Sequence, residues 1–128
     1  PYPEDEMEPN FWLSCMIIDK DAMCKQIRTD GEVYFEHAKG KPCPTEVLET
    51  LAKYNAEGRP IWKPMHMQPI YKDNPLITRE GEVAPGNPDG YEIVDEDIFE
   101  RGLCLPSDNK MSIKQQRQIV EIIRKLFD

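Results

Sequence analysis

Short blocks of hydrophobic residues, separated by polar and proline-rich stretches, run along the 128-residue chain. The first block, residues 11–19, is rich in β-branched and aromatic side chains and predicts a largely buried strand. Residues 21–44 have mixed polarity and no sustained period, so they are left unassigned. Within them, residues 31–35 fit either a short strand or a loop turn. Residues 1–10 hold three prolines and four acidic residues, which predicts a linker or arm.

A helix is predicted to follow the unassigned stretch. It opens at Pro44 and Thr45, where the Thr45 hydroxyl is available to cap free backbone amides. We expect the helix to stop before Gly58, because a residue without Cβ suits a left-handed helix terminus. Its apolar positions at helical spacing are Val47, Leu48, Leu51 and Tyr54.

Proline is frequent in the middle of the chain, where residues 59–91 hold six of the 12 prolines. In residues 59–69, three prolines exclude a helix and a central strand, so we expect an edge strand that runs into a rigid loop. Residues 71–91 read as a loop, since glycine and proline break any period. A loop of this length in a small domain points to function, disorder or a missing partner surface.

The last third of the chain predicts a helix, a strand and a second helix. Residues 95–101 form the first helix, with acids at its start, Ile98 and Phe99 facing inward, and Gly102 at its end. Residues 103–105 then form a short buried strand.

The terminal helix has the clearest pattern. Ser112 and Gln115 have the spacing of a capping box, and the helix is expected over residues 113–127. One apolar face is traced by Ile119, Val120, Ile122, Ile123, Leu126 and Phe127. The order β, α, β, loop, α, β, α predicts a small α/β or α+β layer structure, in which helices cover a short sheet.

Charge and hydropathy argue against several classes of protein. Sixteen basic against 24 acidic residues give a net charge of −8, which argues against nucleic acid and anionic membranes as partners. The longest unbroken apolar run, residues 15–18, is far shorter than the ~20 residues of a membrane span, and no leader opens the chain. We therefore expect a soluble protein.

The four cysteines, at positions 15, 24, 43 and 104, have no zinc-site spacing. Cys15 and Cys104 lie in apolar runs, where a thiol acts as a small buried hydrophobic group. We expect four reduced thiols in a cytoplasmic protein, with one disulfide as the alternative.

Four residues of the 59–69 segment are candidates for binding: Arg59, Trp62, Lys63 and His66. The prolines around them lower the loop's entropy and hold charged groups in place in advance. Lys63 and His66 can meet an anion or a sugar hydroxyl. In the structural alternative, Trp62 belongs to the core, Arg59 and Lys63 pair with surface acids, and His66 is a satisfied polar group.

Two further patterns carry little chemistry. Histidine is a common general base, but no serine or cysteine stands beside His66 in a nucleophile motif. The acids at positions 95–97 resemble paired carboxylates, although acidic residues commonly gather at helix N-termini. The residues alone therefore indicate a soluble α/β domain and no catalytic residue or metal site.

Two motifs are similar to segments of the DegT/StrS-type sugar aminotransferases. Residues 59–69, RPIWKPMHMQP, resemble the family's RPxWKPMHxQP segment, and residues 98–107, IFERGLCLPS, resemble its lFxxGLCLPS segment. Residues 11–13 resemble the strand that opens the family's small domain. Residues 20–44 and 72–92 depart from the family pattern.

The resemblance implies that residues 11–128 form the C-terminal small domain of a pyridoxal phosphate enzyme, with a short, mainly antiparallel sheet covered by helices. The Schiff-base lysine segment, the acid that pairs with the pyridine nitrogen and the phosphate-binding loop belong to a large domain that this chain does not resemble. We therefore expect pyridoxal phosphate in the full-length enzyme, and neither cofactor nor transamination in these 128 residues alone.

In the full-length enzyme, the resemblance implies amino transfer, typically from glutamate, to a nucleotide-linked keto sugar, with a UDP-linked 4-keto-6-deoxy sugar as the leading substrate. It implies a homodimer, since family active sites form between two subunits. His66 and Lys63 would reach the sugar nucleotide or the mouth of the active site, and Arg59 and Trp62 would position the strand. The alternative is a free-standing, non-catalytic binding module with the same fold.

Overall fold

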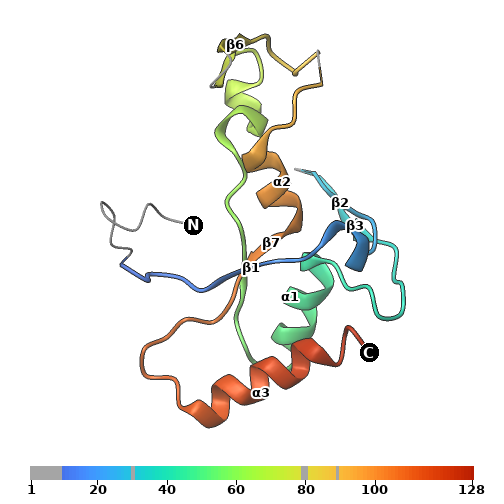
Figure 1. Cartoon of the computed structure of the whole chain (residues 1–128), viewed down its shortest axis with the longest axis vertical. Coiled ribbons are helices and arrows are strands. Elements are labelled where there is room, and N and C mark those ends of the chain that lie inside the picture. The colour runs from blue at the N-terminus through green and yellow to red at the C-terminus, as the bar shows by residue number, and fades with distance from the viewer. Residues whose placement is uncertain (1–9, 30, 79–80, 89) are drawn as a thin grey trace.

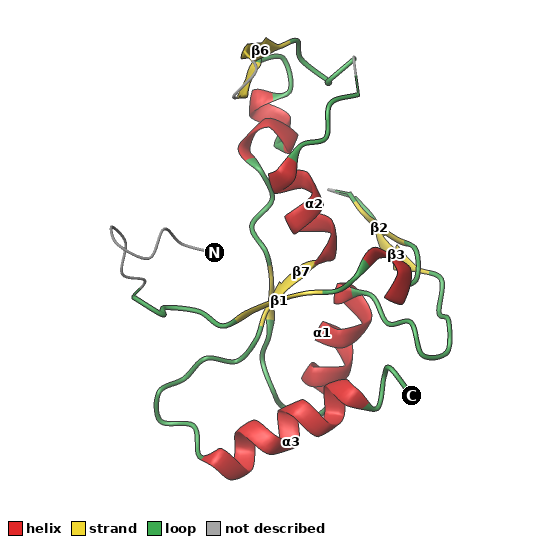
Figure 2. Cartoon of the chain, in the orientation of Figure 1, coloured by secondary structure: helices red, strands yellow, loops and turns green. Residues whose placement is uncertain are grey.

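The structure is a computed structural model that describes residues 10–29, 31–78, 81–88 and 90–128 (Figure 1). Helices and short antiparallel strands alternate along the chain, so the fold is α+β as predicted (Figure 2). The predicted linker lies outside the described residues except for Asn10, whose side-chain oxygen accepts a hydrogen bond from the backbone amide of Trp12 at 3.1 Å.

A three-stranded antiparallel sheet lies at the centre of the molecule. Its order is β1 (Cys15–Ile17), β7 (Gly102–Cys104) and β4 (Arg59–Pro60). The middle strand is completely buried. The predicted edge strand in residues 59–69 is confirmed for its first two residues, after which the chain leaves the sheet. The predicted strand 103–105 is confirmed as β7, which begins and ends one residue earlier than expected.

The first strand is much shorter and more exposed than predicted. Of residues 11–19, only Cys15–Ile17 form a strand, and only Ile18 is buried. Phe11 is 82% exposed and Trp12 is 70% exposed, because both precede the sheet. Cys15 is exposed and not buried as predicted, since β1 is an edge strand with β7 as its single neighbour.

Two helices enclose the hydrophobic core together with the sheet. Helix α1 (Pro44–Lys53) contacts β4, β7 and helix α3 (Ile113–Arg124). Burying these apolar side chains against one another is the main force that holds the sheet and the helices together. The buried cluster consists of Ile18, Val47, Leu51, Leu103 and Ile123.

Helix α1 begins at Pro44 and stops before Gly58 as predicted, but the residues that cap its ends differ from the prediction. Cys43 is the N-cap and makes no side-chain cap, while the Thr45 hydroxyl donates to the side-chain oxygen of Gln26 at 2.8 Å. Asn55, at φ 56°, takes the left-handed conformation after the helix that we expected nearer Gly58. Space around Gly58 is tight, because a Cβ there would lie 3.1 Å from the backbone carbonyl oxygen of Cys104 and 2.7 Å from Cδ2 of Leu48.

The remaining helices match their patterns. Helix α2 (Val94–Arg101) runs directly into β7, with Gly102 as its C-cap. Helix α3 begins with the predicted capping box between Ser112 and Gln115 and ends at Arg124, three residues earlier than expected. Of its predicted apolar face, Val120 is exposed.

Two hairpins and three short 3-10 helices fill the stretches that lacked a period. The unassigned residues contain η1 (Lys20–Ala22) and a hairpin, so the strand alternative for residues 31–35 is confirmed. The predicted loop 71–91 is wrong in part, because strands of three residues are too short to produce a readable alternation. These elements are β2 (Gln26–Arg28), β3 (Val33–Phe35), η2 (Met65–Met67), η3 (Pro69–Tyr71), β5 (Leu76–Thr78) and β6 (Gly81–Val83).

Among the described residues, no helix has the length and apolar character needed to cross a membrane.

Candidate functional site

The proline-rich segment runs along the sheet and then past α2 (Figure 1). At its start, Arg59 lies opposite Cys104 in the β4–β7 ladder. Pro64 is the N-cap of η2 and Pro69 begins η3, so both stand where the backbone turns, whereas Pro60 lies opposite Leu103 in the edge strand β4. The segment therefore presents its side chains from a stiff backbone.

Arg59, Trp62 and Lys63, three of the four predicted site residues, line one groove of about 730 Å³. Trp62 is 62% exposed, so it is not the core residue of the structural alternative. Its ring lies 5.8 Å from the ring of Trp12, at an interplanar angle of 31°. The two tryptophans offer exposed aromatic surface that can stack on a planar ligand.

Positive charge surrounds this aromatic surface. The guanidinium of Arg28 lies 4.3 Å from the centre of the Phe99 ring, and its Nη1 donates to the Phe99 carbonyl at 2.9 Å. Burial lowers the pKa of Arg28, although an arginine stays charged at neutral pH. Arg59 pairs with Glu57 at 2.5 Å, and because both side chains are well exposed, the pair is weak and open to exchange. The groove can therefore attract a phosphate-bearing ligand.

His66, the fourth predicted residue, lies outside this groove. It lines a neighbouring pocket of about 480 Å³, which shares Lys63 and Arg28 with the groove. Its Nε2 is 2.7 Å from the carboxylate of Glu96, its Nδ1 is 3.7 Å from that of Asp95, and its side chain is 19% exposed. These contacts fix the ring of His66 to the first turn of α2.

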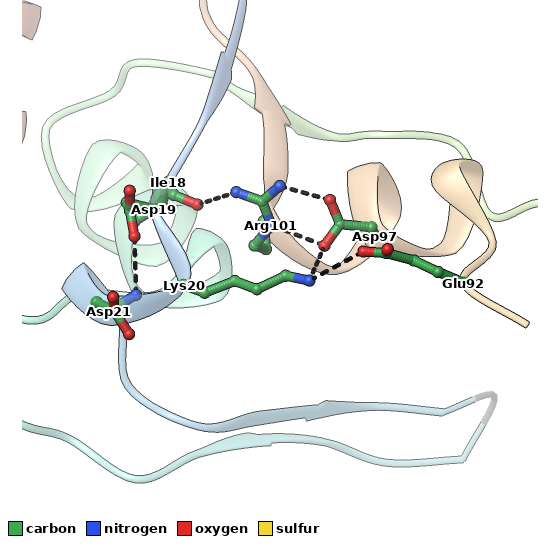
Figure 3. A network of polar contacts seen from close by, with 7 residues as sticks. All are labelled: Ile18, Asp19, Lys20, Asp21, Glu92, Asp97 and Arg101. Carbon is green, nitrogen blue, oxygen red and sulfur yellow. Dashed lines mark hydrogen bonds and ion pairs between the residues drawn. The ribbon is translucent and has the colours of Figure 1, made fainter. Parts of the chain in front are cut away.

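A network of ion pairs holds α2 in place (Figure 3). The carboxylate of Asp97 contacts Lys20 at 2.9 Å and Arg101 at 2.5 Å, and Arg101 also donates to the carbonyl of Ile18 at 2.8 Å. Hydrogen bonds from Arg101 and then Lys20 hold the pKa of Asp97 far below its ordinary value. The acidic residues 95–97 therefore form ion pairs with other side chains. They also lie at a helix N-terminus, where negative charge is favourable.

The sequence reasoning missed two groove residues, Trp12 and Arg28. Trp12 was assigned to a buried strand, and Arg28 lay in the unassigned stretch. Trp12 gave no signal of an exposed position, because an aromatic residue in an apolar run is typical of a buried strand. Arg28 had no such signal, because its place depends on pairing between β2 and β3.

Comparison with known proteins identifies an aminotransferase-related region. Over 84 residues, 66% of this chain, the sequence is 34% identical to the Bacillus subtilis (strain 168) protein named "Putative pyridoxal phosphate-dependent aminotransferase EpsN". The match covers 19% of EpsN, so the chain spans about a fifth of the length of this curated relative. No family model matches the chain.

The described residues do not fit pyridoxal phosphate as a bound group. A lysine that binds this cofactor needs an enclosed pocket with a phosphate cradle. Apart from the half-buried Lys63, which lies between two open pockets, every lysine is exposed. In the described parts of the chain, no group of three or more His, Cys, Asp and Glu residues is arranged to hold a metal ion.

Proposed function

We propose that this chain is the C-terminal small domain, residues 11–128, of a DegT/StrS-type aminotransferase that uses pyridoxal phosphate. The full-length homodimer transfers an amino group from glutamate to a nucleotide-linked keto sugar, with a UDP-linked 4-keto-6-deoxy sugar as its substrate. The similarity to EpsN carries the proposal. The motifs at residues 59–69 and 98–107 support it, because both border the same groove.

The groove has the chemistry to hold a sugar nucleotide. A uracil ring can stack on the exposed faces of Trp12 and Trp62, and its diphosphate can bind Arg28, Arg59 and Lys63. Arg28 is positioned in advance by Phe99, so little order has to be gained on binding. The cofactor belongs to the rest of the protein, where it supplies the electron sink for amino transfer.

The test uses the full-length protein with pyridoxal phosphate, glutamate and a UDP-linked 4-keto-6-deoxy sugar. We expect the absorbance band of bound cofactor and, by mass spectrometry, formation of the amino sugar nucleotide. A full-length protein without the cofactor band would exclude the enzyme and favour the non-catalytic module. A cofactor band without turnover of this sugar would exclude the substrate while keeping the class.

Trp62→Ala tests the role of the groove. Since stacking of a base on an aromatic ring contributes about 1–3 kcal/mol, we expect the KM for the sugar nucleotide to rise about tenfold. The control is Ile77→Ala, an exposed apolar residue of β5 that does not line the groove. Equal effects of the two substitutions would remove the groove from the proposal.

His66→Ala tests the position of the fourth site residue. Loss of its contacts with Glu96 and Asp95 would release η2 from α2, so we expect a higher KM for the sugar nucleotide with a smaller change in kcat. Wild-type kinetic constants would refute its assigned role.

A further inference from the structure

Two cysteines face each other on neighbouring strands of the central sheet. Cys15 of β1 and Cys104 of β7 are paired in the antiparallel register, and their Sγ atoms lie 3.7 Å apart. Cys15 is exposed, whereas Cys104 is 1% exposed and borders the groove.

The hydrogen bonds on both sides identify the type of pairing. The amide of Leu105 donates to the carbonyl of Ser14 at 2.8 Å, and the amide of Ile18 donates to the carbonyl of Arg101 at 3.0 Å. Because bonded and non-bonded pairs alternate along an antiparallel ladder, Cys15 and Cys104 occupy a non-hydrogen-bonded pair. Such pairs bring Cα atoms to about 4.5 Å, within the ~4.4–6.8 Å range that a disulfide spans.

We propose that Cys15 and Cys104 form a thiol modification site that a small disulfide, such as oxidised glutathione, converts reversibly into a cross-strand disulfide. The two sulfur atoms have to approach from 3.7 Å to about 2.05 Å, which side-chain rotation and a small strand shift can supply.

The exposure of the two thiols sets the order of steps. The thiolate of Cys15 attacks oxidised glutathione, forms a mixed disulfide and releases one glutathione thiolate, which takes up a proton. Cys104 then attacks Sγ of Cys15, the second glutathione leaves as thiolate, and the proton of Cys104 passes to it. Two protein thiols are oxidised to one disulfide while one glutathione disulfide is reduced to two thiols.

Cys104 is unsuited to the first step. Burial, with the neighbouring Cys15 thiol, raises the pKa of Cys104 to about 11, so it is almost entirely protonated at neutral pH. As the second thiol it reacts within the molecule, where the attacked sulfur atom is already in contact.

The chain contains its own control pair. Cys24 and Cys43 also interact through their side chains, but both are buried. Oxidised glutathione cannot reach either sulfur atom in the folded protein, so this pair should stay reduced.

The disulfide would close a loop of 89 positions between the two strands. Such a link restricts the unfolded chain, so the midpoint of thermal unfolding should rise by about 10 °C. This inference does not rest on the proposed function, since the readout is thiol chemistry.

The experiment treats the full-length native protein with oxidised glutathione, blocks the remaining thiols with an alkylating reagent, and maps the peptides by mass spectrometry. We expect a linked peptide pair containing Cys15 and Cys104, alkylation of Cys24 and Cys43 after denaturation, and full reversal by dithiothreitol. Cys15→Ser, at an exposed position, should yield no linked peptide and no glutathione on Cys104.

Three outcomes would overturn the proposal. They are a stable glutathione adduct on Cys15 without a link, a link between Cys24 and Cys43, and a link between Cys15 residues of two molecules. Glutathione on Cys104 in the Cys15→Ser protein would overturn the order of steps and with it the role of Cys15.

Discussion

Gly102 joins α2 to β7 at a point where there is no room for a side chain. Its φ of −97° is open to any residue, so conformational freedom is not the reason for glycine here. A Cβ would overlap the carbonyl oxygen of Ile98 and lie 2.7 Å from Cγ1 of Ile61. Because the obstacle at Ile98 is backbone, the helix itself would have to move.

Gly102→Ala should therefore lower the free energy of unfolding by about 1–3 kcal/mol, the usual cost of overpacking. Urea denaturation followed by circular dichroism measures it. The matched control is Gly31→Ala, since a Cβ there has no neighbour within 4 Å, and its effect should stay within about 0.5 kcal/mol. Equal destabilisation by both changes would contradict the steric argument.

Among single residues, the sequence predicts only those site residues that are neighbours in the chain. Arg59, Trp62 and Lys63 were found together because one proline-rich segment carries them. Trp12 and Arg28 were missed, because contacts with residues far along the chain, Trp62 and Phe99, accompany their position in the groove. Cys15 was predicted to be buried because an apolar run does not reveal which strand lies at the edge.

Among the elements, α2 is joined to the start of the chain by Asp97, which contacts both Lys20 and Arg101. The folded-state pKa of this carboxyl is depressed, so its contribution to stability is present above the ordinary value of 3.8. The contribution is lost as the pH falls below that value towards the folded-state pKa.

Asp97→Asn should therefore be less stable than the wild type at pH 7, and the difference should shrink as the pH falls from 4 towards 2. Urea midpoints across this range provide the measurement. Asp21→Asn is the control, because that carboxylate has no ion pair among the described residues. A difference independent of pH would show that Asp97 acts through packing alone.

The capping box of α3 is a second element-scale feature. The Ser112 hydroxyl accepts from the backbone amide of Gln115, and the Gln115 side chain accepts from the Ser112 amide at 2.9 Å. Ser112→Ala should cost about 1 kcal/mol of stability, measured by urea denaturation. Gln118→Ala, at an exposed position within the same helix, should change stability by less than about 0.5 kcal/mol. An unchanged free energy of unfolding in the Ser112→Ala protein would mean that other contacts hold the first turn of α3.

Elements with a helical period were predictable, and the shortest strands were not. Helices α1, α2 and α3 each place apolar residues on one face, which is a signal inside the element itself. The hairpins β2–β3 and β5–β6 have strands of three residues, and backbone pairing defines them more than any side-chain pattern. The left-handed residue that follows α1, Asn55, was also missed, because glycine is the commoner left-handed residue.

In the whole molecule, burial is concentrated at one end. The core lies between the sheet, α1 and α3, whereas the β5–β6 hairpin projects at the opposite end of the long axis (Figure 1). Among the described residues from 65 to 92, Val83 is the single buried one. Local opening of this end should therefore cost little free energy.

Hydrogen exchange should show this difference directly. We expect amides of α1 and β7 to exchange more than tenfold more slowly than those of β5 and β6, after correction for intrinsic rates. Mass spectrometry with peptide-level resolution is sufficient for the comparison. Uniform protection along the chain would mean that another part of the protein covers the projecting end.

The position of β7 also has a consequence for synthesis. Both β1 and β4 pair with this one strand, which begins at Gly102 and follows both of them in the chain. In a polypeptide growing on the ribosome, β1 and β4 therefore stay unpaired until Gly102–Cys104 have emerged. Any nascent chain released before that point would lack the central three-stranded sheet and would expose apolar residues for chaperones to bind.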